Sequence, residues 1–341
     1  MTVDHTGLDP RRPRPFFVVG CPRSGTTLLR DLLRSHPRLA IPTESHFIPG
    51  FYRAFGNPVS DAAAWQIARR ILSTPRVSYW EVQAKPSDFA GCRSFAEVTR
   101  RLYETWAAAE GKPRWGDKTP HYVRDIPLLM RLFPDAQVIH IIRDGRDAAL
   151  SWLRVRFEPK NLYMAARLWK EMVRKGRGDG AALAADSYLE LRYETLISEP
   201  ETTMRSVCRF LGEPFDPAVL KPAPSYPWVG YGKLAVPMMG TTSHGIRSDN
   251  GGRWRERMSL NDRSLFESVA GDLLSELGYP VEGLQEPLSR PQEILYVAQH
   301  RLRQTAAILR RLRRSGFRRN AAVLTGNSVR RLTRRLTAAF R

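Results

Sequence analysis

A short apolar run that ends in a glycine-containing turn constrains the fold of this chain more than any other feature. Residues 16–19 (FFVV) favour a strand, and residues 20–25 (GCPRSG) favour a tight turn. Thr26 and Thr27 then open a segment whose leucines recur at helical spacing. These leucines are Leu28, Leu29, Leu32 and Leu33. The segment therefore predicts a strand, a loop and a helix, in that order.

Two later segments repeat this order. Residues 136–142 (AQVIHII) form an apolar run, the turn sequence RDGRD follows at 143–147, and helical periodicity resumes at 148–152. Residues 188–192 (YLELR) predict a third strand, and a helix is expected over 199–211. Apolar runs without alternation are typical of parallel strands that are covered on both faces. We therefore predict an α/β fold, with a P-loop-type parallel β-sheet flanked by helices on both faces.

The first turn carries the glycine spacing of a phosphate-binding loop. Gly20 and Gly25 enclose four residues, as in a P-loop, where backbone N–H groups at a helix N-terminus form a cradle for an anion. The lysine that reaches the β- and γ-phosphates of ATP is absent, because Thr26 stands in its place and the loop's cation is Arg23. The pattern predicts a loop that binds phosphate without a triphosphate or a metal ion.

Four segments resemble, in order, those of the PAPS-dependent sulfotransferases, where PAPS is 3'-phosphoadenylyl sulfate. Residues 22–28 (PRSGTTL) resemble the loop for the 5'-phosphosulfate, and residues 142–151 (IRDGRDAALS) resemble the motif for the 3'-phosphate. Residues 191–194 (LRYE) resemble the Tyr-Glu turn near the adenine, and residues 251–255 (GGRWR) resemble the late segment that closes over the 3'-phosphate. The resemblance covers residues 15–280 and is closest to the tyrosylprotein and glycan sulfotransferases and to bacterial members of the family.

The resemblance implies a single sulfotransferase domain that moves the sulfuryl group of PAPS onto a hydroxyl of an acceptor. The acceptor class stays open among sugars, glycolipids, phenols, peptide tyrosines and other metabolites. PAPS is the expected co-substrate, and no metal is expected. The residues expected to bind PAPS are Arg23, Ser24, Gly25, Thr26, Thr27, Arg143, Ser151, Tyr193 and Arg253.

Sulfuryl transfer requires a base for the hydroxyl proton and cations that stabilise charge on the departing oxygen. Glu44, in residues 42–47 (PTESHF), stands where the tyrosylprotein and glycan enzymes place a glutamate, and is the expected general base. Lys118, in residues 115–120 (WGDKTP), resembles the lysine that contacts the sulfuryl oxygens in the glycan enzymes. Arg23 is expected to stabilise the departing phosphate.

Several polar residues are alternatives for this chemistry. His121 is the second candidate for the base, because phenol and steroid sulfotransferases use a histidine directly after Lys-Thr, where this chain has a proline. His46 is expected either to orient its loop or to react, whereas His140, inside a predicted strand, is expected in the core. Ser243 and Ser248 are both candidates for a late serine that holds the sulfuryl group.

The net charge of +20 is distributed unevenly. Residues 294–341 contain 13 arginines and no lysine, aspartate or glutamate. We therefore divide the chain into a flexible leader (1–14), the sulfotransferase domain (15–285) and an Arg-rich, partly helical tail (286–341). Apolar residues at helical spacing form two stripes in the tail: Ile294, Ala298, Leu302, Thr305, Leu309 and Leu312, and then Val329, Leu332, Leu336 and Phe340. The tail is expected to be either a solvated extension or a segment that lies on an anionic membrane surface.

Other classes of protein fit the sequence less well. No apolar run reaches the roughly 18 residues of a membrane span, and the start of the chain lacks an apolar signal segment, so we expect a cytoplasmic protein, peripheral on the inner face of the membrane if the tail binds there. The three cysteines show no metal-binding or disulfide spacing. A P-loop small-molecule kinase lacks support without the lysine, and a nucleic-acid partner lacks support without a recognition motif. The oligomeric state is left open.

Overall fold

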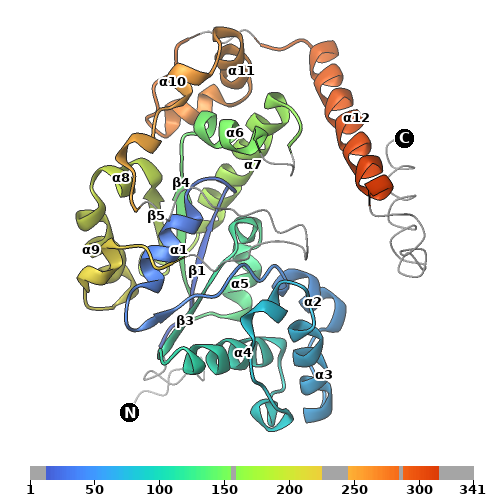
Figure 1. Ribbon diagram of the computed structural model, residues 1–341, viewed down its shortest axis with the longest axis vertical. Coiled ribbons are helices and arrows are strands. Elements are labelled where there is room, and N and C mark those ends of the chain that lie inside the picture. The colour runs from blue at the N-terminus through green and yellow to red at the C-terminus, as the bar shows by residue number, and fades with distance from the viewer. Residues whose placement is uncertain (1–12, 155–158, 225–244, 284–286, 315–341) are drawn as a thin grey trace.

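The core of the protein is a parallel β-sheet, as predicted. The computed structural model describes residues 13–154, 159–224, 245–283 and 287–314. Its five strands lie in the order β2-β3-β1-β4-β5, and every neighbouring pair is parallel (Figure 1). The strands are β1 (Phe16–Gly20), β2 (Leu39–Ala40), β3 (Arg114–Lys118), β4 (Gln137–Ile142) and β5 (Tyr188–Arg192).

Helices connect the strands and cover both faces of the sheet. The longer helices are α1 (Thr26–Arg34), α2 (Ile48–Phe55), α3 (Asp61–Leu72), α4 (Phe95–Ala109), α5 (Ile126–Leu132), α6 (Gly145–Leu153), α7 (Leu162–Ala181), α8 (Tyr193–Ser198), α9 (Pro200–Leu211), α11 (Leu260–Glu276) and α12 (Arg290–Arg314). Short helical segments are η1 (Val77–Trp80), η2 (Pro86–Phe89), η3 (Pro120–Arg124), η4 (Pro217–Leu220), η6 (Ser248–Asn250) and α10 (Trp254–Arg257). The three strand-to-helix units predicted from sequence are β1–α1, β4–α6 and β5–α9; between β5 and α9, where a turn was expected, the chain forms the short helix α8.

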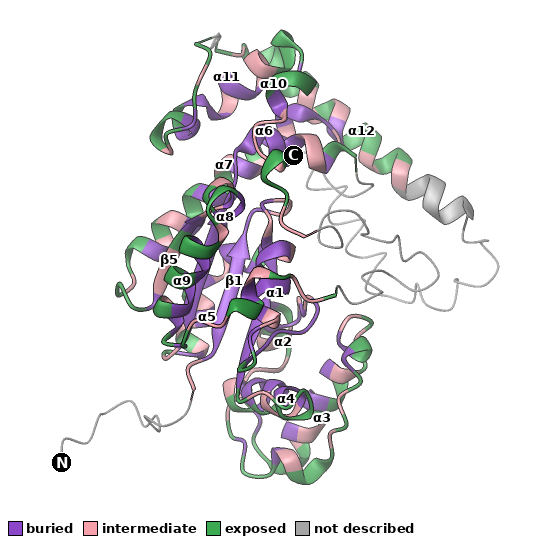
Figure 2. Ribbon diagram, turned by 60° about the vertical axis from the view of Figure 1, so that its left-hand side comes forward, coloured by how far each residue is buried: buried purple, intermediate pink, exposed green. Residues whose placement is uncertain are grey.

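The two hydrophobic cores lie on opposite faces of the sheet because side chains alternate along each strand. Phe16 and Val18 of β1 pack with α1, α8 and α9 on one face. Phe17 and Val19 pack on the other face, with residues of α4, α5, α6, α7 and α11. Figure 2 shows the central strands as buried along their length. The prediction of helices on both faces is therefore confirmed.

Sequence reasoning missed β2 and β3. β2 has only two residues, and β3 reads RWGDK, in which glycine, aspartate and lysine disfavour strands. All five residues of β3 are nonetheless buried, and residues distant in the sequence contact its charged side chains. Arg114 donates to Gln137 and to the Leu211 carbonyl oxygen, and Asp117 accepts from the Tyr103 hydroxyl at 2.5 Å.

Within the predicted tail the structure describes one helix, α12, over residues 290–314. The second apolar stripe and residues 1–12 of the predicted leader lie outside the described residues. Among the helices that are described, none combines the length and the apolarity needed to cross a membrane. The three cysteines are buried free thiols.

Candidate active site

The loop between β1 and α1 has the backbone of an anion cradle. Gly25 adopts a φ of 92° at the start of α1, and a Cβ built there would lie 2.2 Å from the Tyr193 ring. Arg23 also lies in the left-handed region, with a φ of 73°, which turns the loop sharply before the helix. The first amides of a helix have no intrahelical partner, so those of α1 are available to an anion. Ser24 Oγ is fully buried and has no hydrogen-bond partner within the described residues.

The two sequence motifs for phosphate meet directly. Arg23 Nε donates a hydrogen bond to Ser151 Oγ at 2.9 Å, and Arg143 donates to the Arg23 carbonyl oxygen at 3.4 Å. They converge because β1 and β4 are adjacent parallel strands whose carboxyl ends lie at one edge of the sheet. The Arg143 guanidinium also lies over the Tyr193 ring, 4.4 Å from its centroid. Arg143 Nε is buried and has no hydrogen-bond partner in the part of the chain that is described.

The late glycine-rich segment, residues 250–254, packs against Arg143 and Asp147 of the 3'-phosphate motif. Asp147 of α6 accepts hydrogen bonds from the backbone N–H groups of Gly252 and Trp254, at 2.7 and 2.9 Å. Asn250 connects three of the predicted residues: its carbonyl oxygen accepts from Arg143, its side-chain amide donates to the Tyr193 hydroxyl at 2.6 Å, and its side-chain oxygen accepts from Arg253 at 3.1 Å. Arg143, Tyr193 and Arg253 are therefore held together by backbone and amide contacts.

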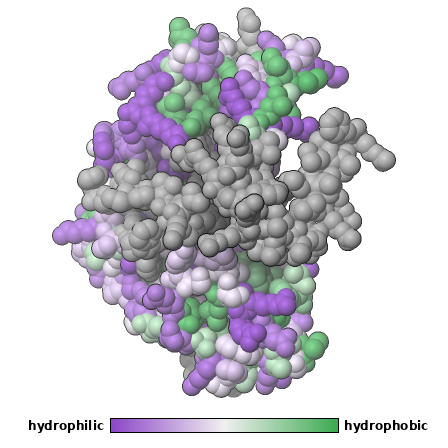
Figure 3. All heavy atoms as spheres, turned by 45° about the vertical axis from the view of Figure 1, so that its right-hand side comes forward, coloured by the Kyte–Doolittle hydropathy of each residue, from purple (hydrophilic) through white to green (hydrophobic). Residues whose placement is uncertain are grey.

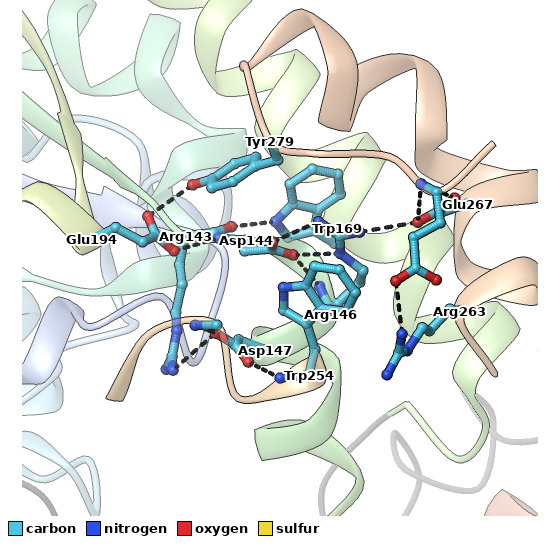
Figure 4. Close-up of polar contacts among 12 residues, drawn as sticks. Arg143, Asp144, Arg146, Asp147, Trp169, Glu194, Trp254, Arg263, Glu267 and Tyr279 are labelled. Atoms are coloured by element: carbon cyan, nitrogen blue, oxygen red, sulfur yellow. Dashed lines mark hydrogen bonds and ion pairs between the residues drawn. The ribbon is translucent and has the colours of Figure 1, made fainter. Parts of the chain in front are cut away.

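Behind this segment lies a buried network of charges (Figure 4). Arg146 is fully buried, pairs with Asp144 at 2.8 Å and with Glu267 at 3.0 Å, and lies 3.5 Å from the ring centroid of Trp254. Trp169 donates its indole N–H to the Arg143 carbonyl oxygen at 3.0 Å. The network joins the turn after β4 to α6, α7, α10 and α11, and its Trp169 hydrogen bond holds the Arg143 backbone in place.

Glu194, in α8 directly after the last strand, is hydrogen-bonded to this network. Its carboxylate accepts from the Asp144 backbone N–H and from the Tyr279 hydroxyl, both at 2.9 Å. Burial raises the pKa of Glu194, although these hydrogen bonds act in the opposite direction. Sequence reasoning gave no role to Asp144 or Asp147, although both lie inside the quoted motif, and it missed Glu267 and Tyr279 altogether. No spacing in the sequence relates Glu267 or Tyr279 to that motif.

The second cluster surrounds Glu44. Its Oε1 lies 2.6 Å from Lys118 Nζ, and its Oε2 lies 2.8 Å from His46 Nε2 and 3.6 Å from the Arg76 guanidinium. The same Lys118 ammonium donates to Thr27 Oγ1 at 3.4 Å. The ion pair therefore connects the candidate base to the phosphate loop. Arg76, directly before η1, was not expected from the sequence.

Charges and burial act together on these groups. Burial favours the neutral form of Glu44, but Lys118 and His46 outweigh it and hold the pKa of this carboxyl well below its usual range. Burial lowers the pKa of Lys118, and Glu44 opposes that change. Burial and the nearby Arg143 lower the pKa of Arg23. The loop and its surroundings thus concentrate positive charge, which favours an anionic ligand.

The remaining candidate histidines and serines differ in how close they lie to the Glu44 cluster. The rings of His46 and His121 lie 5.6 Å apart, so both histidines border the Glu44 cluster. His140 is fully buried in β4, as predicted, and its Nδ1 lies 2.7 Å from the Tyr188 hydroxyl. Ser248 is exposed in η6, and Ser243 lies outside the described residues. Within the ranges that the structure describes, no group of three or more His, Cys, Asp or Glu could hold a metal ion.

A sequence model of the sulfotransferase family matches residues 15–217, which is more than half of the chain. The chain belongs to the sulfotransferase family. The match includes both phosphate motifs, Glu44 and Lys118, and it ends before the late segment around Arg253. The prediction of the family from four short motifs is therefore confirmed.

Individual relatives agree with this membership. The sulfotransferase-family chain is 26% identical over 216 residues to protein-tyrosine sulfotransferase A of Caenorhabditis elegans, a match that covers 61% of this chain and 53% of the relative. It is 28% identical over 297 residues to the nodulation protein NoeE of Sinorhizobium fredii, covering 77% of this chain and 65% of that protein. The chain thus spans about half to two thirds of the length of these relatives.

Solved sulfotransferase structures share the fold. The sulfotransferase domain of the Synechococcus PCC 7002 olefin synthase matches with a TM-score of 0.51 and 27% identity, covering 76% of this chain and 96% of that domain. The sulfotransferase domain from the curacin biosynthetic pathway matches with a TM-score of 0.56 and 22% identity, covering 80% of this chain and 99% of that domain. At 22% identity, the likeness to the curacin-pathway domain shows a shared fold alone.

Proposed function

We propose that this member of the sulfotransferase family transfers the sulfuryl group of PAPS to a hydroxyl of an acceptor. The observation that carries the proposal is the 2.9 Å contact of Arg23 with Ser151, because it brings the two predicted phosphate motifs to one place. Opposite ends of a doubly phosphorylated adenosine can be bound only if both motifs lie within one nucleotide's reach. The relatives named sulfotransferases support the same activity.

The residues present fit such a nucleotide. Ser24 Oγ and Arg143 Nε are buried polar atoms that have no partner within the described ranges, and each lies in one of the two motifs. Buried polar atoms are normally hydrogen-bonded, so two such atoms here favour a polar ligand. The 5'-phosphosulfate would be held by residues 23–27, and the 3'-phosphate by Arg143, Ser151 and Arg253. Tyr193, whose ring packs against the Arg143 guanidinium, would flank the adenine.

When bound, PAPS supplies the sulfuryl group and leaves as the 3',5'-bisphosphate PAP. Glu44 is proposed to take the proton of the acceptor hydroxyl. Both of its carboxylate oxygens have cationic or histidine partners in this structure, and a carboxylate held in this way is a weak base. A shift of the Lys118 ammonium from Glu44 toward Thr27 and the phosphate loop would free Oε1 and raise the pKa of Glu44. Lys118 would then stabilise charge on the group being transferred.

Arg23 is proposed to stabilise the oxygen on which negative charge develops as the nucleotide departs. Its guanidinium is held by Ser151, so its position is set before any ligand binds. His121 remains the second candidate for the base, since it borders the Glu44 cluster. The proposed acceptor is a hydroxylated sugar, glycolipid, phenol or metabolite, and the proposed location is the cytoplasm.

Calorimetric titration tests the nucleotide, and a transfer assay tests the reaction. PAP, PAPS and ATP are titrated with and without Mg²⁺, and labelled sulfate from PAPS is then screened against acceptors of the four classes. We expect tight PAP binding that does not depend on Mg²⁺, and transfer to one acceptor class. Preference for ATP with a requirement for Mg²⁺ would contradict the proposal in favour of a kinase.

A further inference from the structure

The last described helix, α12, packs on the body of the protein through its polar side. The Tyr296 ring stacks on Tyr163 of α7, with centroids 5.3 Å apart. Asn161, at the start of α7, donates to the Tyr296 carbonyl oxygen at 2.7 Å and to Gln299 at 3.2 Å. His300 is buried, and its Nδ1 accepts from the Lys160 backbone N–H at 3.2 Å. This docked face is aromatic and polar.

The opposite face of α12 is apolar and exposed. The side chains of Ile294, Leu295 and Leu302 are 68%, 66% and 71% exposed, and Ala298 between them is exposed as well. At 100° per residue these positions fall within one arc of the helix, roughly opposite His300 and the docked residues. A surface helix usually buries its apolar face and exposes its polar face, whereas α12 does the reverse. Figure 2 shows exposed residues along α12, and Figure 1 shows the helix at the side of the molecule, apart from the sheet.

The same helix is strongly basic. From Arg290 to Arg314 it contains seven arginines, with Glu293 as its only acidic residue. Arg301 is exposed next to Leu302. At the top of the molecule, where Figure 1 places α10, α11 and the start of α12, Figure 3 shows hydrophobic and hydrophilic residues exposed side by side. Large aliphatic side chains bordered by arginines are the composition of helices that lie in a membrane interface.

We propose that the exposed face of α12, defined by Ile294, Leu295, Ala298 and Leu302, docks onto an anionic lipid bilayer. The aliphatic side chains would enter the interface, and the arginines would contact the lipid phosphates. A second copy of this chain fits the face less well, because it would bring together two helices with seven arginines each. A nucleic acid would use the arginines and leave the aliphatic side chains exposed to water. The proposal does not depend on the proposed enzymatic activity.

Vesicle flotation of the full chain tests the proposal. Binding is measured on phosphatidylcholine vesicles with and without phosphatidylglycerol, and at rising NaCl concentration. We expect binding only to the anionic vesicles and weaker binding as salt screens the arginines. The triple variant Ile294→Ser, Leu295→Ser, Leu302→Ser should bind anionic vesicles roughly 100-fold more weakly, because three aliphatic side chains no longer enter the interface.

A matched control is the double variant Val59→Ser, Tyr79→Ser, which removes side chains that are 90% and 47% exposed on either side of α3, away from α12. It should bind vesicles like the wild type. Both variants should keep the wild-type Tm, since none of these side chains is buried. Equal vesicle binding by wild type and triple variant, or no binding by the wild type, would overturn the proposal.

Two further results would replace the bilayer with another occupant. If the triple variant changes the sedimentation coefficient of the protein and leaves vesicle binding unchanged, the face is an interface between copies of the chain. If Arg301→Gln weakens binding to duplex DNA and the triple variant alters neither DNA nor vesicle binding, the helix is a site for a nucleic acid. Either result overturns the docking of this face on lipid.

Discussion

Lys118 joins the candidate base to the phosphate loop, since its ammonium lies 2.6 Å from Glu44 Oε1 and 3.4 Å from Thr27 Oγ1. Glu44 follows β2, Lys118 ends β3 and Thr27 lies in α1, so the contact unites three elements that are far apart in the sequence. The Lys118 ammonium is therefore positioned to stabilise either the Glu44 carboxylate or an anion bound in the phosphate loop. This arrangement makes the chemistry of Glu44 dependent on what the loop holds.

Replacement of the base should separate binding from turnover. Glu44→Gln is expected to lower kcat by about 100- to 10,000-fold, the usual contribution of a general base, and to leave PAP affinity within a few-fold of wild type. Kinetics with the acceptor found in the screen, together with PAP calorimetry, measure the two effects. Glu110→Gln, at an exposed position after α4, is the matched control and should change neither. Retained turnover in Glu44→Gln would move the base to His121.

The ion pair between Glu44 and Lys118 should make the free energy of unfolding depend on pH. The pKa of Glu44 in the folded protein lies well below its usual value of 4.5, with Lys118 the main stabilising partner, so the ionised form is favoured by folding. This contribution is fully present above the unfolded-state pKa and is lost as pH falls through the folded-state pKa. The difference in unfolding free energy between wild type and Glu44→Gln should therefore be constant above pH 4.5 and narrow below it. Urea unfolding across this range measures it, and a constant difference at all pH values would contradict the assigned pairing.

The 3'-phosphate motif can be tested with ligands that differ by one phosphate. Arg143→Ala should weaken PAP binding by roughly 10- to 100-fold, because a charge-assisted hydrogen bond is lost. Binding of adenosine 5'-phosphate, which lacks the 3'-phosphate, should change little. Arg174→Ala removes an exposed arginine that pairs with Asp272 and serves as the control. An equal loss for both nucleotides would place Arg143 elsewhere on the ligand.

Gly25 is expected to be required for both space and backbone conformation. Gly25→Ala should destabilise the protein by about 2–4 kcal/mol, since it combines a left-handed φ with a Cβ that meets the Tyr193 ring. Gly212→Ala has a similar φ of 73° but no atom within 4 Å of the added Cβ, and should lose only about 1 kcal/mol. Chemical denaturation compares the two. Equal losses would show that the contact with Tyr193 adds nothing.

The buried network behind the site should be sensitive to the loss of its central cation. Arg146→Met leaves the carboxylates of Asp144 and Glu267 buried without their shared partner, and should destabilise the protein by about 3–5 kcal/mol. Arg174→Met breaks an exposed pair and should change stability by less than about 1 kcal/mol. Similar small effects of both changes would mean that the network is dispensable for the fold.

Much of the sheet could be predicted from local sequence. The units β1–α1, β4–α6 and β5–α9 each combine a run of β-favouring residues, a turn and a helical pattern, and these signals act over neighbouring residues. The family followed from the same segments, since the phosphate motifs lie in the connections between strand and helix. Glycine and arginine at fixed positions of a loop determine its conformation and charge locally.

The pairing of distant residues was decided by the tertiary structure. β3 is a strand although most of its residues do not favour strands, and its buried charged side chains contact Gln137, Leu211, Tyr103 and Glu44. Contacts between distant elements likewise bring Asp147 to the late segment and Lys118 to Glu44. The contacts of α12 with the body also leave its apolar stripe exposed. Each depends on contacts between elements separated by many residues, and the energy of such contacts appears only when the chain has folded. Sequence determined the local pieces and their ligand chemistry, and packing determined which charges came to lie together.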